Sequence, residues 1–252
     1  MHFTNFYNED LKNALDENFS NIVTENVGPF IYSTIKTIRP KKILEIGAGY
    51  TSIFFAQALK EIEEENNFDV KLINEEKIDP DWERRHRLLN KDYQYSAESK
   101  LIIVDNFSKE KHDTARPVDN AIKKLHLDKY IDFVEADGMD LQKINEMVSN
   151  YLPLDFVFLD FGAGAALPIL FKFYFERINN HGGYIMVHST LTNAMHRLWL
   201  AELKLKYIND SSVEIMSFLE PNKIMQNSFT LIKKNIETET GQFNPPIYTA
   251  QP

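Results

Sequence analysis

The sequence predicts an α/β fold in which one mostly parallel sheet carries helices on both faces. Three observations lead to this prediction. Short apolar runs rich in β-branched residues recur along the chain, and most of them end at glycine or an acidic residue. Longer segments with helical periodicity separate these runs, which is the alternation typical of parallel sheets. The last two runs are separated only by residues 220–227, a gap that suits an antiparallel hairpin.

Seven runs are predicted as strands, and each has its own justification. In chain order they are 42–46, closed by a glycine turn; 100–104, ended by Asp105; 130–135, which alternates; 154–159, apolar apart from Asp155; 184–187, opened by two glycines; and the closing pair 213–219 and 228–233. We expect the final strand to be inserted antiparallel beside its neighbour.

A helix is predicted after each of the first five strands, because apolar residues recur three or four apart along one face. These helices are expected at about 51–63, 117–127, 141–151, 167–178 and 191–205.

The predicted core domain covers residues 41–235, and three segments are additions to its strand–helix pattern. Residues 1–40 are expected to be mostly helical and to form an acceptor cap or a dimer contact. Residues 64–99 form an insertion, rich in charged residues, that is either a solvated helical excursion, a lid or a dimerisation arm. The polar tail 236–252 contains several prolines and is expected to be extended.

Composition narrows the class of protein. The 252 residues have a formal net charge of -9, which disfavours nucleic acid as a partner. No run approaches the ~20 apolar residues that span a membrane. The chain has no cysteine, and its first residues do not resemble a signal peptide, so we expect a cytoplasmic protein.

Polar groups follow one predicted strand after another. In an open parallel sheet, ligands bind outside the carboxyl ends of the strands. At these ends stand Glu45 with the turn Gly47-Ala48-Gly49, then Asp105, Asp137, Asp160 and His188. A carboxylate can accept both hydroxyl hydrogens of a ribose, as at Asp105, or an amine hydrogen of a purine, as at Asp137. Ser52 stands where a dinucleotide motif has its third glycine, which disfavours NAD.

The segment Leu44 to Gly49 resembles the first motif of class I S-adenosylmethionine-dependent methyltransferases. The acids and glycines after the later strands follow in that family's order, so the resemblance covers about residues 41–233. It implies a Rossmann-like, doubly wound, seven-stranded sheet with an antiparallel last strand. It also implies S-adenosylmethionine as cofactor and S-adenosylhomocysteine as product.

Carried over residue by residue, the resemblance assigns the cofactor site. Gly47 and Gly49 would contact the methionine part, with Glu45 supporting the turn, and Asp105 would hold the ribose. Asp160 would lie near the sulfonium and amino end. The remaining expected contacts are Asp137, Gly138 and Met139 at the adenine, with Ala48, Tyr50 and Asn106 completing the site.

A second position in the sequence could supply the acidic residue that binds the ribose. Family members usually carry it about 20 residues after the turn, and the insertion moves Asp105 far beyond that. Glu75 and Glu76 stand nearer in sequence. We favour Asp105 because the segment from it to Ile131 makes one normal helix–strand unit, whereas a start at Glu75 leaves an overlong connection.

A closer likeness is to catechol and caffeoyl-coenzyme A O-methyltransferases, carried by 158–160 and 183–191. Those enzymes bind Mg²⁺ through an acid after the fourth strand and an Asp-Asn pair after the fifth. Here His188 and Ser189 stand in place of the pair. Mg²⁺ prefers oxygen ligands in octahedral geometry, so a metal-independent enzyme is predicted, with a softer metal on His188 and Asp160 as the alternative.

The predicted function is transfer of a methyl group to an oxygen or nitrogen of a small-molecule acceptor. His188 is the expected base, because an imidazole titrates near neutral pH, and Asp160 is the second catalytic candidate. His188 could instead bond only to neighbouring backbone. Alternatives are methylation of RNA or protein, or a cofactor-binding module without turnover. We expect a homodimer with no nucleic-acid or membrane partner.

Overall fold

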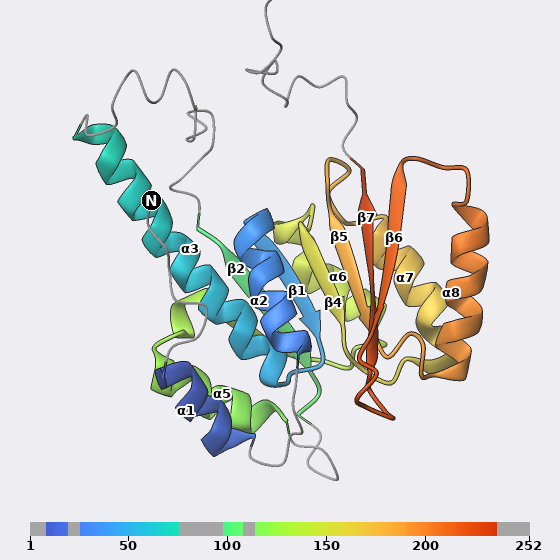
Figure 1. Ribbon diagram of the computed structural model, residues 1–252, viewed down its shortest axis with the longest axis horizontal. Coiled ribbons are helices and arrows are strands. Elements are labelled where there is room, and N and C mark those ends of the chain that lie inside the picture. The colour runs from blue at the N-terminus through green and yellow to red at the C-terminus, as the bar shows by residue number, and fades with distance from the viewer. Residues whose placement is uncertain (1–8, 20–25, 76–97, 108–113, 236–252) are drawn as a thin grey trace, which may run out of the picture.

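The central sheet has seven strands in the order β3-β2-β1-β4-β5-β7-β6 (Figure 1). The computed structural model describes residues 9–19, 26–75, 98–107 and 114–235. The strands are β1 (Lys42–Ile46), β2 (Lys100–Asp105), β3 (Ile131–Glu135), β4 (Phe156–Leu159), β5 (Tyr184–His188), β6 (Val213–Leu219) and β7 (Ser228–Lys234). β1 to β5 pair in parallel, and β7 runs antiparallel between β5 and β6. The predicted sheet and its antiparallel last strand are confirmed.

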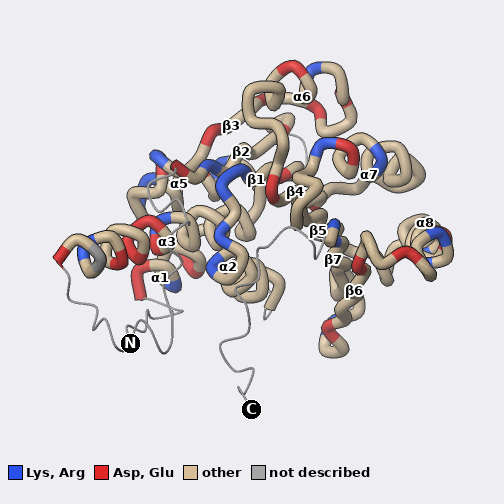
Figure 2. The backbone as a smooth tube through the Cα atoms, turned by 90° about the horizontal axis from the view of Figure 1, so that it is seen from above, with Lys and Arg blue, Asp and Glu red and all other residues tan. Residues whose placement is uncertain are grey.

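Helices cover both faces of this sheet (Figure 2). They are α1 (Glu9–Asn18), α2 (Val27–Ile38), α3 (Tyr50–Asn74), α5 (Ala115–Leu125), α6 (Leu141–Val148), α7 (Leu167–Phe175) and α8 (Ala194–Lys206). The apolar faces of α1, α2, α3 and α5 form one buried cluster with the sheet, and those of α6, α7 and α8 form a second. The parallel strands are therefore buried on both sides, which explains their nearly continuous apolar sequence.

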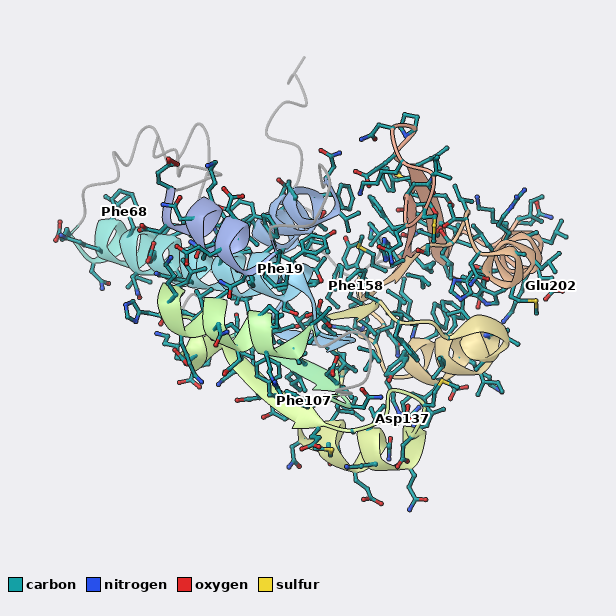
Figure 3. All side chains as sticks on the ribbon, turned by 90° about the horizontal axis from the view of Figure 1, so that it is seen from below. Phe19, Phe68, Phe107, Asp137, Phe158 and Glu202 are labelled. Carbon is teal, nitrogen blue, oxygen red and sulfur yellow. The ribbon has the colours of Figure 1, made fainter. Side chains whose placement is uncertain are left out.

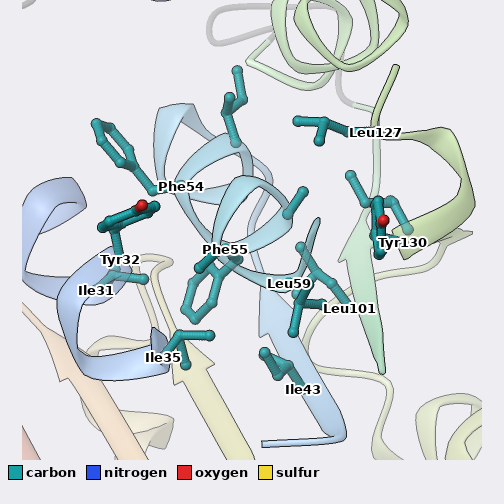
Figure 4. Packing of buried hydrophobic residues seen from close by; sticks show 14 of the residues in the cluster. Ile31, Tyr32, Ile35, Ile43, Phe54, Phe55, Leu59, Leu101, Leu127 and Tyr130 are labelled. Atoms are coloured by element: carbon teal, nitrogen blue, oxygen red, sulfur yellow. The ribbon is translucent and has the colours of Figure 1, made fainter. Parts of the chain in front are cut away.

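The first cluster shows how the helices are fixed to the sheet (Figure 4). Phe55 of α3 is fully buried, and its ring lies 5.7 Å from that of Phe156 and 5.9 Å from that of Phe158, centre to centre. Burying such a side chain contributes about 1.5–3 kcal/mol. Ile31 and Ile35 bring α2 onto the same helix. The start of α3, which follows the glycine turn, is thus held rigidly against β4.

α3 departs most from prediction, because it continues to Asn74 instead of ending near Glu63. Glu65 pairs with Lys36 and with Arg39, the second contact at 2.6 Å, and Asn66 accepts from Arg39 at 2.6 Å. These contacts hold the polar extension of α3 against α2. The first part of the predicted insertion is therefore a continuation of this helix, and residues 76–97 lie outside the described residues.

Other boundaries move by a few residues for local reasons. The helix predicted from 191 begins at Ala194, because the Asn193 side chain accepts the N–H groups of Met195 and His196 and caps it. The helix predicted over 141–151 ends as α-helix at Val148 and finishes as a 3₁₀ turn. The helix predicted to 178 ends at Phe175.

The N-terminal segment is helical where it is described, as expected. α1 lies along α5, and α2 lies along α3. Its role as an acceptor cap or dimer contact stays a prediction, as do the homodimer and the cytoplasmic location. The tail 236–252 lies outside the described residues. Within the described part of the chain, no helix is long and apolar enough to cross a membrane.

Candidate active site

The residues predicted from the sequence lie at the carboxyl ends of the five parallel strands. The register pairs Ile46 with both Val104 and Leu159, and Leu159 with Val187, so these strands end together. Figure 3 views the molecule from the side of this edge and labels Phe107 and Asp137 there.

The turn after β1 requires glycine at its first position. Gly47 has φ +97°, and a Cβ atom there would lie 2.3 Å from the carbonyl oxygen of Asp160. Its N–H donates to the carbonyl of Val104 at 2.9 Å. A Cβ on Gly49, by contrast, would meet only the Thr51 hydroxyl, at 3.8 Å. The turn is therefore pressed against the β4 loop on one side and leaves room for a ligand at Gly49.

Glu45 supports this turn from inside. Its side chain is fully buried and accepts hydrogen bonds from Thr51 Oγ1 at 2.7 Å and Ser52 Oγ at 2.5 Å. Burial raises the pKa of Glu45 to about 8, against the two hydroxyl donors, and the nearby carboxylates of Asp160 and Asp105 add to the rise. Glu45 thus ties the end of β1 to the start of α3.

Asp105 links two loops of the site. Its Oδ2 accepts from the N–H of Ala48 at 2.9 Å, and its Oδ1 accepts from the N–H of Phe107 at 2.7 Å. Each carboxylate oxygen retains a further lone pair that can accept a hydroxyl hydrogen. The geometry fits a ribose-binding acid that is already oriented by the glycine turn.

The length of α3 places Glu75, one of the two rival acids, far from the glycine turn. This helix has 25 residues and begins at the glycine turn, so its far end lies about 37 Å along the helix axis. Glu75 follows that far end. Glu76 lies outside the described residues. The carboxyl edge of the sheet therefore has Asp105, not Glu75, beside the turn.

The loop after β3 comes close to β1 at Gly138. A Cβ atom at this glycine would lie 2.6 Å from Ile46 Cγ2 and 3.4 Å from the ring of Phe161. Asp137 Oδ1 accepts the N–H of Met139 at 2.9 Å, and both side chains are exposed. This loop thus lies beside the end of β1 with a carboxylate and a thioether facing solvent.

Asp160 and His188 are in direct contact. Asp160 Oδ1 lies 2.6 Å from His188 Nδ1, and the two side chains are 26% and 13% exposed. A carboxylate on Nδ1 favours the tautomer that carries its proton there and leaves the lone pair on Nε2. Nε2 lies 3.4 Å from the carbonyl oxygen of Gln226. The two catalytic candidates therefore form one hydrogen-bonded pair, and the Gln226 carbonyl faces the other ring nitrogen of His188.

Several residues near the carboxyl edge of the sheet have strained backbone conformations. Non-glycine residues rarely adopt a left-handed conformation, and where they do the cost is of order 1–3 kcal/mol each. Among the described residues that do so, three lie here: Phe107, Ser189 and Gln226. Two others, Arg39 and His126, follow the ends of helices, where this conformation is common. The strained residues thus flank Asp105 and His188.

His196 does not join the site. It is 3% exposed, with no hydrogen-bond partner for either ring nitrogen among the described residues. Burial lowers its pKa, with the carbonyls of Ser189 and His188 acting in the opposite direction. It is therefore part of the core beneath the strand end.

Sequence reasoning missed the contribution of the β6–β7 hairpin. Gln226 reaches His188 through its main chain, and Ser228 accepts the N–H of Ser189 with its carbonyl at 2.6 Å. Main-chain contacts between segments about 40 residues apart leave no side-chain signature in a sequence.

At the positions where the magnesium-dependent enzymes would have their ligands, this chain has Asp160, His188 and Ser189. Mg²⁺ requires several oxygen ligands in octahedral geometry. The described residues contain no group of three or more His, Asp or Glu side chains placed to hold a metal ion. Asp160, the acid that would serve as a ligand in the magnesium-dependent enzymes, is instead bonded to His188.

Comparisons with known proteins show the fold. The chain matches an O-methyltransferase of Bacillus cereus, solved in complex with S-adenosylhomocysteine, with 14% identity and a TM-score of 0.59 over 91% of this chain and 92% of the other. It matches TomG of Streptomyces achromogenes, an O-methyltransferase of tomaymycin synthesis solved with S-adenosylmethionine, with 15% identity and a TM-score of 0.58 over 91% of both chains. A Staphylococcus aureus protein assigned as a caffeoyl-CoA O-methyltransferase matches with 14% identity and a TM-score of 0.52, over 92% and 93%.

The sequence itself gives no such match. No protein-family model and no curated protein aligns with it. The structural likeness nevertheless extends over about nine tenths of the chain and includes the sheet order and the antiparallel β7. The chain therefore has the Rossmann-like fold of O-methyltransferases, including those of the caffeoyl-CoA type.

Proposed function

We propose that this protein is an S-adenosylmethionine-dependent methyltransferase that acts on an oxygen or nitrogen of a small-molecule acceptor. One observation carries the proposal. The main chain of Asp160 contacts the glycine turn at Gly47, while its side chain holds His188 at 2.6 Å. A base is thus placed beside the turn that would hold the cofactor.

The residues of this edge fit the cofactor. The open side of Gly49 would receive its methionine part, and Asp105 would accept its ribose hydroxyls. Residues 137–139 would lie beside its adenine. When bound, the cofactor supplies a methyl group on a positively charged sulfur. Glu45 would keep the turn rigid without touching the ligand, since its side chain is fully buried.

His188 would act on the acceptor. His188 Nε2 would accept the proton that the acceptor oxygen or nitrogen loses as it takes the methyl group. Asp160 would stabilise the resulting imidazolium through Nδ1. A positioned base of this kind contributes about 10²–10⁴-fold to a rate.

We also propose that the reaction needs no metal. The support is chemical: an imidazole and a serine hydroxyl replace the oxygen ligands of the magnesium-dependent relatives, and the remaining acid is paired with the imidazole. The net charge of -9 argues against RNA as the acceptor.

The test is turnover of a labelled methyl donor with a panel of phenols, carboxylic acids and amines. Wild type is compared with His188→Gln, and His181→Gln is the matched control because His181 is exposed and precedes β5 at the opposite edge. We expect His188→Gln to keep cofactor binding and to lose about 10²–10⁴-fold in rate. We expect His181→Gln and EDTA to change nothing.

Each other result has a meaning. Full turnover by His188→Gln would show that His188 is not the base. Loss of activity in EDTA that Mg²⁺ restores would overturn metal independence. Cofactor binding without turnover on any acceptor class would favour the non-catalytic module.

A further inference from the structure

The β6–β7 hairpin, residues 220–227, holds the segment around His188 from one side. The Gln226 carbonyl faces His188 Nε2 at 3.4 Å. Immediately beyond the hairpin, Ser228 accepts the N–H of Ser189 with its carbonyl at 2.6 Å and the N–H of Leu191 with its hydroxyl at 2.9 Å. The hairpin therefore forms one side of the surroundings of the imidazole, opposite Asp160.

A buried polar cluster fixes the base of this hairpin. Glu220 Oε1 accepts from the Asn26 N–H at 3.2 Å and from Asn26 Nδ2 at 2.6 Å, and Oε2 accepts from Lys223 Nζ at 2.5 Å. The Glu220 and Lys223 side chains are 9% and 5% exposed. The Glu220 N–H closes the hairpin on the Asn227 carbonyl at 2.6 Å. We call Asn26, Glu220 and Lys223 the hairpin clamp.

The clamp joins the hairpin to the N-terminal segment. Asn26 directly precedes α2, and Phe30 in the first turn of α2 lies 5.0 Å from Phe218 and 4.7 Å from Phe229, ring centre to ring centre. Phe229 is the register partner of His188. Apolar contacts therefore hold α2 to the strands, and the clamp is the charged contact that holds it to the hairpin itself.

The Glu220 side chain is charged in the hairpin clamp. Burial alone would raise its pKa, but the hydrogen bonds from Lys223 and Asn26 hold the pKa of Glu220 below its ordinary value. The hairpin also contains strain, since Gln226 is a non-glycine residue at φ +49°. Such a conformation persists only where the surrounding contacts impose it.

We propose that Glu220 is a positioning residue for His188. Through the clamp it keeps the hairpin closed on the imidazole, fixes the Gln226 carbonyl opposite Nε2, and makes the state of the base depend on the contact with Asn26. The inference rests on the proposed function only for the role of His188 as a base. The rival reading is that the clamp merely stabilises the fold.

The test is the ¹⁵N spectrum of the histidine side chains, which reports ring tautomer and protonation without any need for cofactor or acceptor. The His188 signals are assigned by their loss in His188→Gln. Glu220→Gln removes the charge and keeps the shape. Glu61→Gln is the matched control, because Glu61 is an equally buried carboxylate on α3 that accepts from Tyr32 and Lys36 of α2 and lies away from the hairpin.

We expect both variants to unfold at a lower temperature and only Glu220→Gln to shift the His188 signals. Unchanged His188 signals in Glu220→Gln would overturn the proposal, as would an equal shift in Glu61→Gln. Should Glu220→Gln fail to fold, Asn26→Ala tests the same point, since it removes the hydrogen bond from Asn26 Nδ2 and keeps both the main-chain N–H donor and the Glu220–Lys223 pair. Failure of cofactor binding is a separate result that bears on the proposed function alone.

Discussion

Replacing Glu45 by Gln should change how the stability of this protein depends on pH. Glu45 is fully buried beneath the glycine turn, and burial raises its pKa from 4.5 to about 8. Between these two values the folded protein keeps the proton, while the unfolded chain has released it. The folded state therefore loses stability as the pH rises through this interval.

The magnitude follows from the shift. One pKa unit corresponds to about 1.4 kcal/mol, so the wild type should lose at most about 1.4 kcal/mol per pH unit relative to Glu45→Gln. Over the full interval from 4.5 to about 8, the upper limit is roughly 5 kcal/mol. That is a large part of the 5–15 kcal/mol that holds a typical domain folded. Gln keeps an oxygen for one of the hydroxyls of Thr51 and Ser52 and carries no charge to bury.

The assay is urea unfolding of both proteins at pH 5, 6, 7 and 8. Subtracting the Glu45→Gln values from the wild-type values cancels the titrating groups that do not interact with Glu45, so the difference reports Glu45 together with its coupling to Asp160 and Asp105. We expect the wild type to lose stability relative to Glu45→Gln with each increase in pH. A difference that stays constant, or that moves in favour of the wild type, would refute the reasoning about burial.

Three further predictions concern packing and capping, and all are read by urea unfolding. Gly47→Ala should destabilise the folded protein by about 1–3 kcal/mol or more, because the new Cβ would lie 2.3 Å from the Asp160 carbonyl oxygen. The control Gly162→Ala should have little effect, because no heavy atom lies within 4 Å of the position of its Cβ. Equal losses of stability in the two variants would contradict this. Tyr174→Phe should leave stability unchanged or raise it by about 1 kcal/mol, since its buried hydroxyl has no partner among the described residues, and a clear loss would reveal a missed contact. Asn193→Ala should cost about 1 kcal/mol by removing the cap of α8, and no change would show that the cap is dispensable.

Much of the fold was predictable because the strands are short, apolar and separated by glycine or acidic residues. The extension of α3 was not, because its charged residues carry no apolar period. Glu65 and Asn66 are held by Lys36 and Arg39, which lie 26–29 residues earlier in the chain. Such partners are brought together only by the packing of α2 on α3.

Only part of the candidate site could be predicted from the sequence. The acidic residues at the strand ends, such as Asp105 and Asp160, could be predicted as candidate site residues from their type and position. The direct bond between Asp160 and His188 depends on the pairing of β4 with β5, which sets their ends side by side. The hairpin clamp was invisible, because Asn26 and Glu220 are 194 residues apart.

The most direct test of the central claim is calorimetric titration with S-adenosylmethionine and S-adenosylhomocysteine. Wild type is compared with Asp105→Asn and with Glu135→Gln, which removes the same charge from the register partner of Asp105 on β3. We predict that wild type and Glu135→Gln bind both ligands alike, and that Asp105→Asn weakens both by ~1.5–3 kcal/mol, the range for a hydrogen bond to a charged group. No binding by the wild type, or equal binding by all three proteins, would contradict a cofactor site at this edge of the sheet.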